Sequence, residues 1–212
     1  MLGGSPMTAD GSGDVFLGHY RKDVKTSIWR VNGTIVVPEV FADLGSLLDS
    51  VPADNVMTET HSALVVAPEA SDATKLAAPA ARYPEEQRNV TVDAYLWYVR
   101  KEGDNDFHLI LGSSDGSAAG QATRYMTAEV SGLPAADSAD VDTLRQVRAQ
   151  LAALIGGSAG SLRYEALTPP TAIRVTGSLF FDGDHRTGEV GPTGHKPQTL
   201  WEIHPVSDLQ TR

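Results

Sequence analysis

Acidic residues and histidines recur two residues apart in short segments of alternating apolar and polar side chains. Asp106 is followed by His108, Glu202 is followed by His204, and Glu129 lies in a third segment of this kind. Carboxylate and imidazole groups can act as general acids and bases, and they can ligate Zn, Mn, Fe or Ca without any sulfur ligand. Residues two apart in a strand share one face. The spacing therefore places each Asp–His or Glu–His pair on a single side of its strand.

The stretch 90–112 predicts the hairpin that carries the first pair. Apolar and polar residues alternate on both sides of a charged turn at 100–105, which is the pattern of a half-buried antiparallel hairpin. An apolar stripe over 138–155 predicts an amphipathic helix. Alternating segments predict three further strands, at 124–130, 173–182 and 200–206.

The first 88 residues are less regular. Residues 1–18 are rich in Gly, Ser and Asp and predict a disordered tail. Residues 19–88 predict an N-terminal arm of mixed structure and a connector. Its expected elements are a hairpin at 27–37 turning at Asn32-Gly33, a helix at 38–51 and a short strand at 61–67. Residues 89–212 then form the main domain.

The order of these elements predicts a mainly β fold. Three strands, a helix and two more strands over 89–208 resemble the OB-fold, a five-stranded Greek-key barrel. In that barrel the second, third and fifth strands lie side by side. If their apolar residues point inward, Asp106, His108, Glu129, Glu202 and His204 share one outer face. Asp182 and His185, just past the fourth strand, would approach its edge.

The amino-acid sequences of several segments resemble those of a set of uncharacterised bacterial proteins. The segments are DVKT at 23–26, DFHLIL at 106–111, AEV at 128–130, FFDGDH at 180–185 and WEIHPV at 201–206. This resemblance implies a shared fold and carries no activity.

A looser similarity is to the staphylococcal-nuclease type of OB-fold, in which a Gly-Asp turn opens the second strand, as at 103–106. Of the groups that hold calcium and a phosphodiester there, only Asp106, Arg124 and Glu129 have counterparts in this sequence.

Two interpretations of the shared face remain open at the level of sequence. In one, the five side chains form a metal or acid–base site, with Zn, Mn or Ca as the candidate ion. In the other, which the sequence favours, the residues are polar because that side of the sheet is solvated, and the His–Glu pairs only stabilise neighbouring strands. Tyr95 and Trp97 also point outward from the first strand, where they could stack on bases or lie under the arm or a partner protein.

Composition limits the classes of function. The chain has 212 residues, no cysteine and a formal net charge of −10, so it offers no thiolate ligands and its overall field argues against nucleic acid as a partner. It contains no apolar run of the roughly 20 residues that a membrane helix needs and opens without the pattern of a secretory signal. A cytoplasmic location is expected, with no membrane partner.

Three hypotheses for function follow. The first is a non-catalytic binding module for a protein or a small polar ligand. The second is a metal-dependent hydrolase, such as a nuclease-like phosphodiesterase, that uses the outer-face cluster. The third is binding of single-stranded nucleic acid through Tyr95 and Trp97.

Overall fold

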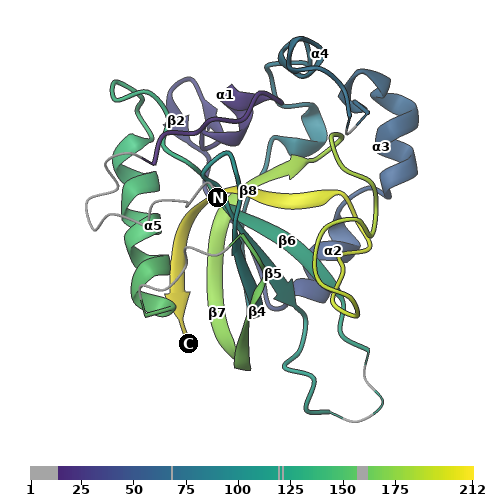
Figure 1. Ribbon diagram of the computed structural model, residues 1–212, viewed down its shortest axis with the longest axis vertical. Helices are drawn as coiled ribbons and strands as arrows, with labels where there is room; N and C mark the ends of the chain where they lie inside the picture. Colours follow the sequence, from purple (N-terminus) through teal and green to yellow (C-terminus); the bar gives the residue numbers. More distant parts are fainter. Residues whose placement is uncertain (1–13, 68, 119, 121, 157–161) are drawn as a thin grey trace.

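The protein is mainly β, with a six-stranded mixed sheet in a ring-like arrangement. The computed structural model describes residues 14–67, 69–118, 120, 122–156 and 162–212. The strand order is β3–β4–β5–β6–β8–β7, and an additional β4–β7 pairing closes the ring (Figure 1). The strands are β3 Glu39–Phe41, β4 Asn89–Lys101, β5 Phe107–Gly112, β6 Tyr125–Val130, β7 Glu165–Phe181 and β8 Trp201–Thr211.

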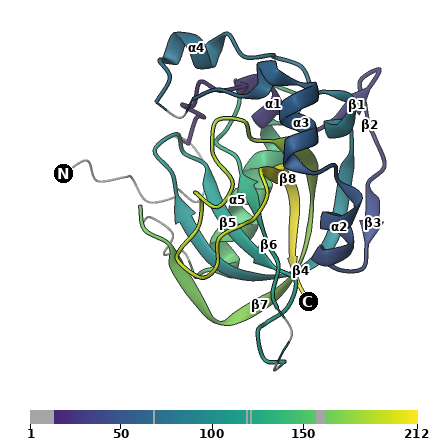
Figure 2. The same cartoon turned by 90° about the vertical axis from the view of Figure 1, so that its right-hand side faces the viewer.

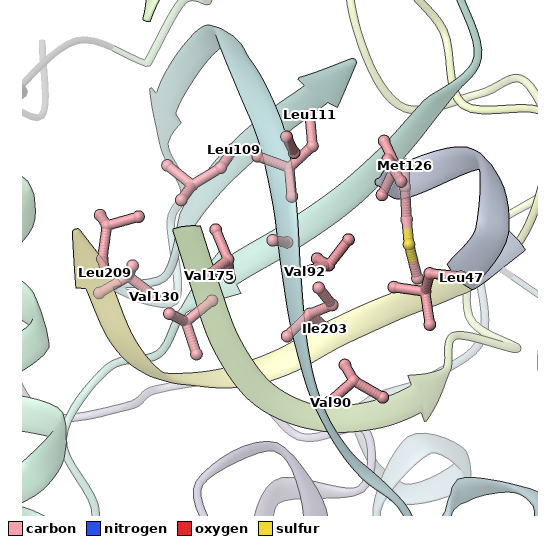
Figure 3. Close-up of a cluster of buried hydrophobic side chains, with 14 of the residues drawn as sticks. Leu47, Val90, Val92, Leu109, Leu111, Met126, Val130, Val175, Ile203 and Leu209 are labelled. Atoms are coloured by element: carbon pink, nitrogen blue, oxygen red, sulfur yellow. The ribbon is translucent and has the colours of Figure 1, made fainter. Parts of the chain in front are cut away.

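Alternating apolar residues fill the inside of the ring. Leu109 and Leu111 of β5 point inward together with Val92 of β4, Met126 of β6 and Ile203 of β8 (Figure 3). All five side chains are fully buried. The predicted alternation in the 90–112 hairpin is therefore confirmed, although a register shift between Leu96 and Tyr98 changes the phase near the end of β4.

Helices cover the outside of the ring. The longest, α5 Val141–Leu154, packs along β8 (Figure 1). In both views α1 Lys22–Lys25 and α4 Asp72–Leu76 lie at one end of the molecule, and α2 Leu44–Ser50 and α3 Asp54–Thr60 lie on one side (Figure 1, Figure 2). Two short 3₁₀ turns, η1 Ser62–Leu64 and η2 Pro84–Glu86, complete the arm. None of the described helices is long and apolar enough to cross a membrane.

The N-terminal arm is more regular than its composition indicates. The hairpin at 27–37 is confirmed as β1 Arg30–Val31 and β2 Thr34–Ile35, with both turn residues, Asn32 and Gly33, at positive φ. The helix expected over 38–51 is only partly correct. The chain first adds β3 beside β4, and α2 begins after Asp43, whose carboxylate caps it.

Two other expectations for the arm need correction. The strand expected at 61–67 is wrong, because η1 occupies Ser62–Leu64. Residues 1–13 of the expected tail lie outside the described residues. Residues 14–18, by contrast, hold defined contacts: Phe16 is buried, and the Asp14 carboxylate lies 3.0 Å from Nη2 of Arg148.

We expect Leu109→Ala to lower the free energy of unfolding by about 2–5 kcal/mol, because it leaves a cavity inside the ring. Urea unfolding followed by circular dichroism measures the change. Val40→Ala is the control. Val40 is 76% exposed, so its loss should change stability by less than about 0.5 kcal/mol. Equal effects of the two substitutions would contradict the assigned inward face of β5.

Candidate functional site

The outer face of three adjacent strands carries the candidate site. Strand pairing sets His108 of β5 opposite Glu129 of β6, and it sets Thr127 of β6 opposite Glu202 of β8. Because side chains alternate along each strand, the outward residues next to these pairs fall on the same side. The structure thus brings together all five residues that the sequence placed on one face: Asp106, His108, Glu129, Glu202 and His204.

Glu129 lies at the centre of this cluster. One carboxylate oxygen is 2.6 Å from Nε2 of His108, and the other is 2.9 Å from Nδ1 of His204. The other ring nitrogen of His204 is 3.4 Å from Oδ2 of Asp106, and a Glu202 oxygen lies 3.7 Å from Nδ1. The backbone N–H of Gly132 donates to Oδ1 of Asp106 at 2.5 Å and fixes that carboxylate.

These contacts are close, yet many do not point along hydrogen-bond directions. Within the described part of the chain, both ring nitrogens of His204, both oxygens of Glu129 and Oδ2 of Asp106 are buried without a partner in hydrogen-bonding geometry. Buried polar atoms almost always have a partner, and exceptions call for an explanation such as a bound ion.

Asp106, Glu129 and His204 fit a divalent cation. Each offers one ligand atom, and these atoms all lie within 4.8 Å of one another. Two ligands on opposite sides of one metal ion, at bond lengths of roughly 2.0–2.6 Å, are separated by at most about 4–5 Å. Two carboxylates and an imidazole suit Zn, Mn or Fe, whereas Ca would require more oxygen ligands.

The cluster is covered rather than solvated. Asp106, Glu129 and His204 are fully buried, and His108 and Glu202 are at most 7% exposed. The prediction of a solvent-exposed outer face is therefore wrong. The physical reason is that the N-terminal arm packs across this side, as Tyr20 and Val24 contact the outward-pointing Phe180 of β7.

Buried arginines hold the arm in place. Arg21 donates two hydrogen bonds to the Glu86 carboxylate, at 2.6 and 2.7 Å, and neither side chain is exposed. The same carboxylate accepts the backbone N–H of Phe181. Arg82 donates to the carbonyl oxygens of Val24, Ser27 and His204, and to that of Leu179. The arm, η2 and strands β7 and β8 are thereby joined around the cluster.

Burial and mutual repulsion set the charges of the carboxylates. Burial, with the nearby negative charge of Glu129, raises the pKa of Glu202, and burial with Asp104 and Glu129 raises the pKa of Asp106. Burial would also raise the pKa of Glu129, but His108, His204 and Lys25 outweigh it and lower that pKa. Asp106 and Glu202 thus resist ionisation. The residues around them carry too little positive charge to hold all three carboxylates in the ionised form.

Asp182 and His185 form a second group beside the cluster. The Nδ1 atom of His185 is 2.5 Å from Oδ2 of Asp182, and the His185 and His108 rings lie 6.3 Å apart. Asp182 raises the pKa of His185 to about 9, more than offsetting burial. Burial would raise the pKa of Asp182, but Lys25 and His185 outweigh it and lower that pKa. At neutral pH the two residues form an ion pair.

A cleft of about 410 Å³ leads to the cluster. His108 lines it, and this side chain is also in contact with Glu129. Lys25 and His185 line the cleft from the arm and from the loop after β7. The side chain of His108 therefore separates the candidate metal ligand Glu129 from the open, polar cleft.

A larger cavity, of about 560 Å³, lies between α2, α3 and the loops around residues 123 and 199. The charged residues Asp54 and Arg124 that line this cavity already have partners within the protein. Asp54 accepts hydrogen bonds from Thr187, Thr199 and the backbone of Leu200, and Arg124 pairs with Asp49. Arg124 lies at the opposite end of β6 from Glu129, so it does not join the site as the nuclease similarity implied.

The aromatic residues of the first strand lie elsewhere. Trp97 is half-buried, donates to the carbonyl of Ser114 at 3.0 Å, and packs against the rings of Tyr125 and His195. Tyr95 is also half-buried. Trp97 therefore packs among loops of the main domain, and neither aromatic residue belongs to the metal-ligand cluster.

Lys25 is the main residue that sequence reasoning missed. It is 6% exposed, lies over the Phe180 ring, and its charge acts on Glu129, Asp182 and Glu202. Lys25 belongs to the DVKT segment, which the sequence analysis noted without assigning a role to its lysine. Comparison of the chain with protein-family models and with curated proteins finds no match.

We expect Arg21→Met to lower the free energy of unfolding by about 3–5 kcal/mol, because it leaves the buried Glu86 carboxylate without its cation. Thermal or urea unfolding measures this loss. Arg174→Met is the matched control, since Arg174 pairs with Asp93 at the surface and its loss should cost less than about 1 kcal/mol. A small effect at Arg21 would mean that the arm does not depend on this pair.

The Asp182–His185 pair predicts a pH dependence of stability. A histidine whose pKa is raised on folding adds stability that is fully present below its unfolded pKa, about 6.5, and that disappears as pH rises through the folded value. That folded value is about 9. Wild type should therefore exceed His185→Asn in stability at pH 6 by more than at pH 9.5. Urea unfolding at both values measures the difference, and a constant gap would contradict the ion pair.

Proposed function

We propose that the protein is a divalent-metal-dependent hydrolase whose ion is held by Asp106, Glu129 and His204. The observation that carries this proposal is the convergence of three buried ligand atoms within 4.8 Å behind a cleft that His108 lines. Among the described residues, Oδ2 of Asp106 and Nε2 of His204 are buried without a hydrogen-bond partner, and a bound ion would supply one to each.

The strand arrangement supports an OB-fold-like barrel as the scaffold of this site. Strands β4, β5, β6, β8 and β7 follow one another around the ring, and β4 pairs with β7. The helix α5 lies in sequence between β6 and β7, the place expected from the OB-fold. The β6–β8 pairing is parallel, and it sets Glu129 beside Glu202 and His204.

The chemistry follows from the positions of the side chains. Asp106, Glu129 and His204 would hold the ion, and the ion would supply Lewis-acid activation of a water molecule and of a substrate ester oxygen. His108 lies between the ligand Glu129 and the cleft. Its other ring nitrogen, Nδ1, lies 3.3 Å from the Glu102 carboxylate, so His108 is placed to hold the ligand Glu129 in position behind the cleft. The cover of the arm keeps bulk solvent from the ligands, which strengthens the electrostatic interactions there.

Metal binding should raise the melting temperature. A ligand that binds only the folded state stabilises it by about 2.7 kcal/mol at a concentration one hundred times its Kd. Metal analysis and thermal melts with Mn²⁺ or Zn²⁺ measure this effect. Glu129→Gln should abolish the shift, whereas Glu165→Gln, at an exposed glutamate of β7, should retain it. A wild-type melt that no divalent ion alters would overturn the proposal.

Turnover separates a hydrolase from a binding module. Bis(p-nitrophenyl) phosphate is a suitable first substrate, because its cleavage releases a coloured product. Wild type with Mn²⁺ should cleave it, and His108→Gln should lose cleavage while it retains the metal-induced shift in melting temperature. Metal binding without cleavage of this or other phosphate esters would instead support a non-catalytic binding module.

A further inference from the structure

Lys25 carries a buried charge that also faces the cleft. Only 6% of the side chain is exposed, and it lines the cleft in front of the cluster. Among the described residues, its ammonium group has no ion pair within 4.0 Å and donates no hydrogen bond. Carboxylates of the cluster act on it only through longer-range attraction. The Phe180 ring lies 5.3 Å from this ammonium group, but a ring face accepts no charged hydrogen bond, so the group is placed to bind an anion in the cleft.

His185 lines the same cleft from the loop that follows β7. Its Nδ1 atom is engaged by Asp182, which leaves Nε2 as the ring nitrogen that can donate into the cleft. The pair with Asp182 keeps the ring protonated at neutral pH. The structure therefore presents two cationic donors, one from α1 and one from the loop after β7.

We infer that Lys25 and His185 form an anion subsite in front of the metal ligands, and that the substrate of the proposed hydrolase is a phosphate ester. The inference rests on the proposed function and adds the class of substrate. Two donors from separate elements, together with a metal ion behind them, can each take a different oxygen of a tetrahedral phosphate. A flat carboxylate offers only two oxygens and suits this arrangement less well.

The charge balance makes anion binding depend on the metal. Without an ion, the ionised carboxylates of Glu129 and Asp182 act on Lys25 and His185 and repel an incoming anion. Several acidic residues at the rim are already paired, as Asp184 is with Lys75 and Glu102 is with Arg100. A divalent ion changes the local balance in favour of anions, so metal and phosphate should each increase the affinity of the other.

Calorimetric titration with inorganic phosphate tests this subsite. The protein is first loaded with Mn²⁺ and freed of excess metal, and acetate serves as the carboxylate probe. Phosphate should bind the loaded wild type more tightly than acetate does, and more tightly than it binds the metal-free protein. Lys25→Met should weaken phosphate binding about ten- to a hundredfold, the effect of losing one charged hydrogen bond. His185→Asn should act in the same direction.

Lys22→Met is the matched control. Lys22 is an exposed lysine of the same helix, α1, and lines a different cavity, so its loss should change phosphate affinity less than threefold. If Lys25→Met fails to fold, the more exposed His185 still decides the matter. Equal losses at Lys25 and Lys22, unchanged affinity in both Lys25→Met and His185→Asn, or equal binding of acetate would overturn the subsite while metal binding stands. A chain that binds neither metal nor phosphate would overturn both proposals.

Discussion

The burial of several carboxylates on one side of the sheet is the constraint on which the rest of the structure depends. Asp106, Glu129, Asp182 and Glu202 are at most 3% exposed, and each would be more stable in water than next to another negative charge. Such a group can persist only if other parts of the fold supply stability and positive charge. Lys25, carried by the arm, provides the nearest buried ammonium.

The two faces of the sheet differ in this respect: one stabilises the fold, and the other carries the charged groups. The inner face is filled by apolar side chains such as Leu109, Met126 and Ile203, and it stabilises the ring without help from the outer face. The outer face can therefore carry carboxylates that repel one another. Local conflict of this kind, in a fold that is otherwise consistent, is the pattern expected at functional sites.

Period-2 alternation was sufficient to predict the strands of the main domain and the shared face of the site residues, and an apolar stripe at helical spacing predicted the helix before β7. It could not predict that this face is buried. Polar residues at outward positions have the same pattern whether they meet water or another part of the chain. The cover comes from Tyr20, Val24 and Arg82, in a segment whose short helices and turns have no long periodicity. Contacts between residues so far apart in sequence leave no local signal.

The residues around the candidate site come from segments that are scattered along the chain, and the arm supplies one of them. DVKT brings Lys25, FFDGDH brings Asp182 and His185, and the segments at 106–111 and 201–206 bring the Asp–His and Glu–His pairs. None of these segments forms a site alone. The fold brings Lys25, His108 and His185 to one cleft and places Asp106, Glu129 and His204 together behind it. The proposed cation and anion sites would account for residues of both signs in that one place. A requirement for stability alone would be met more simply by apolar side chains of similar size.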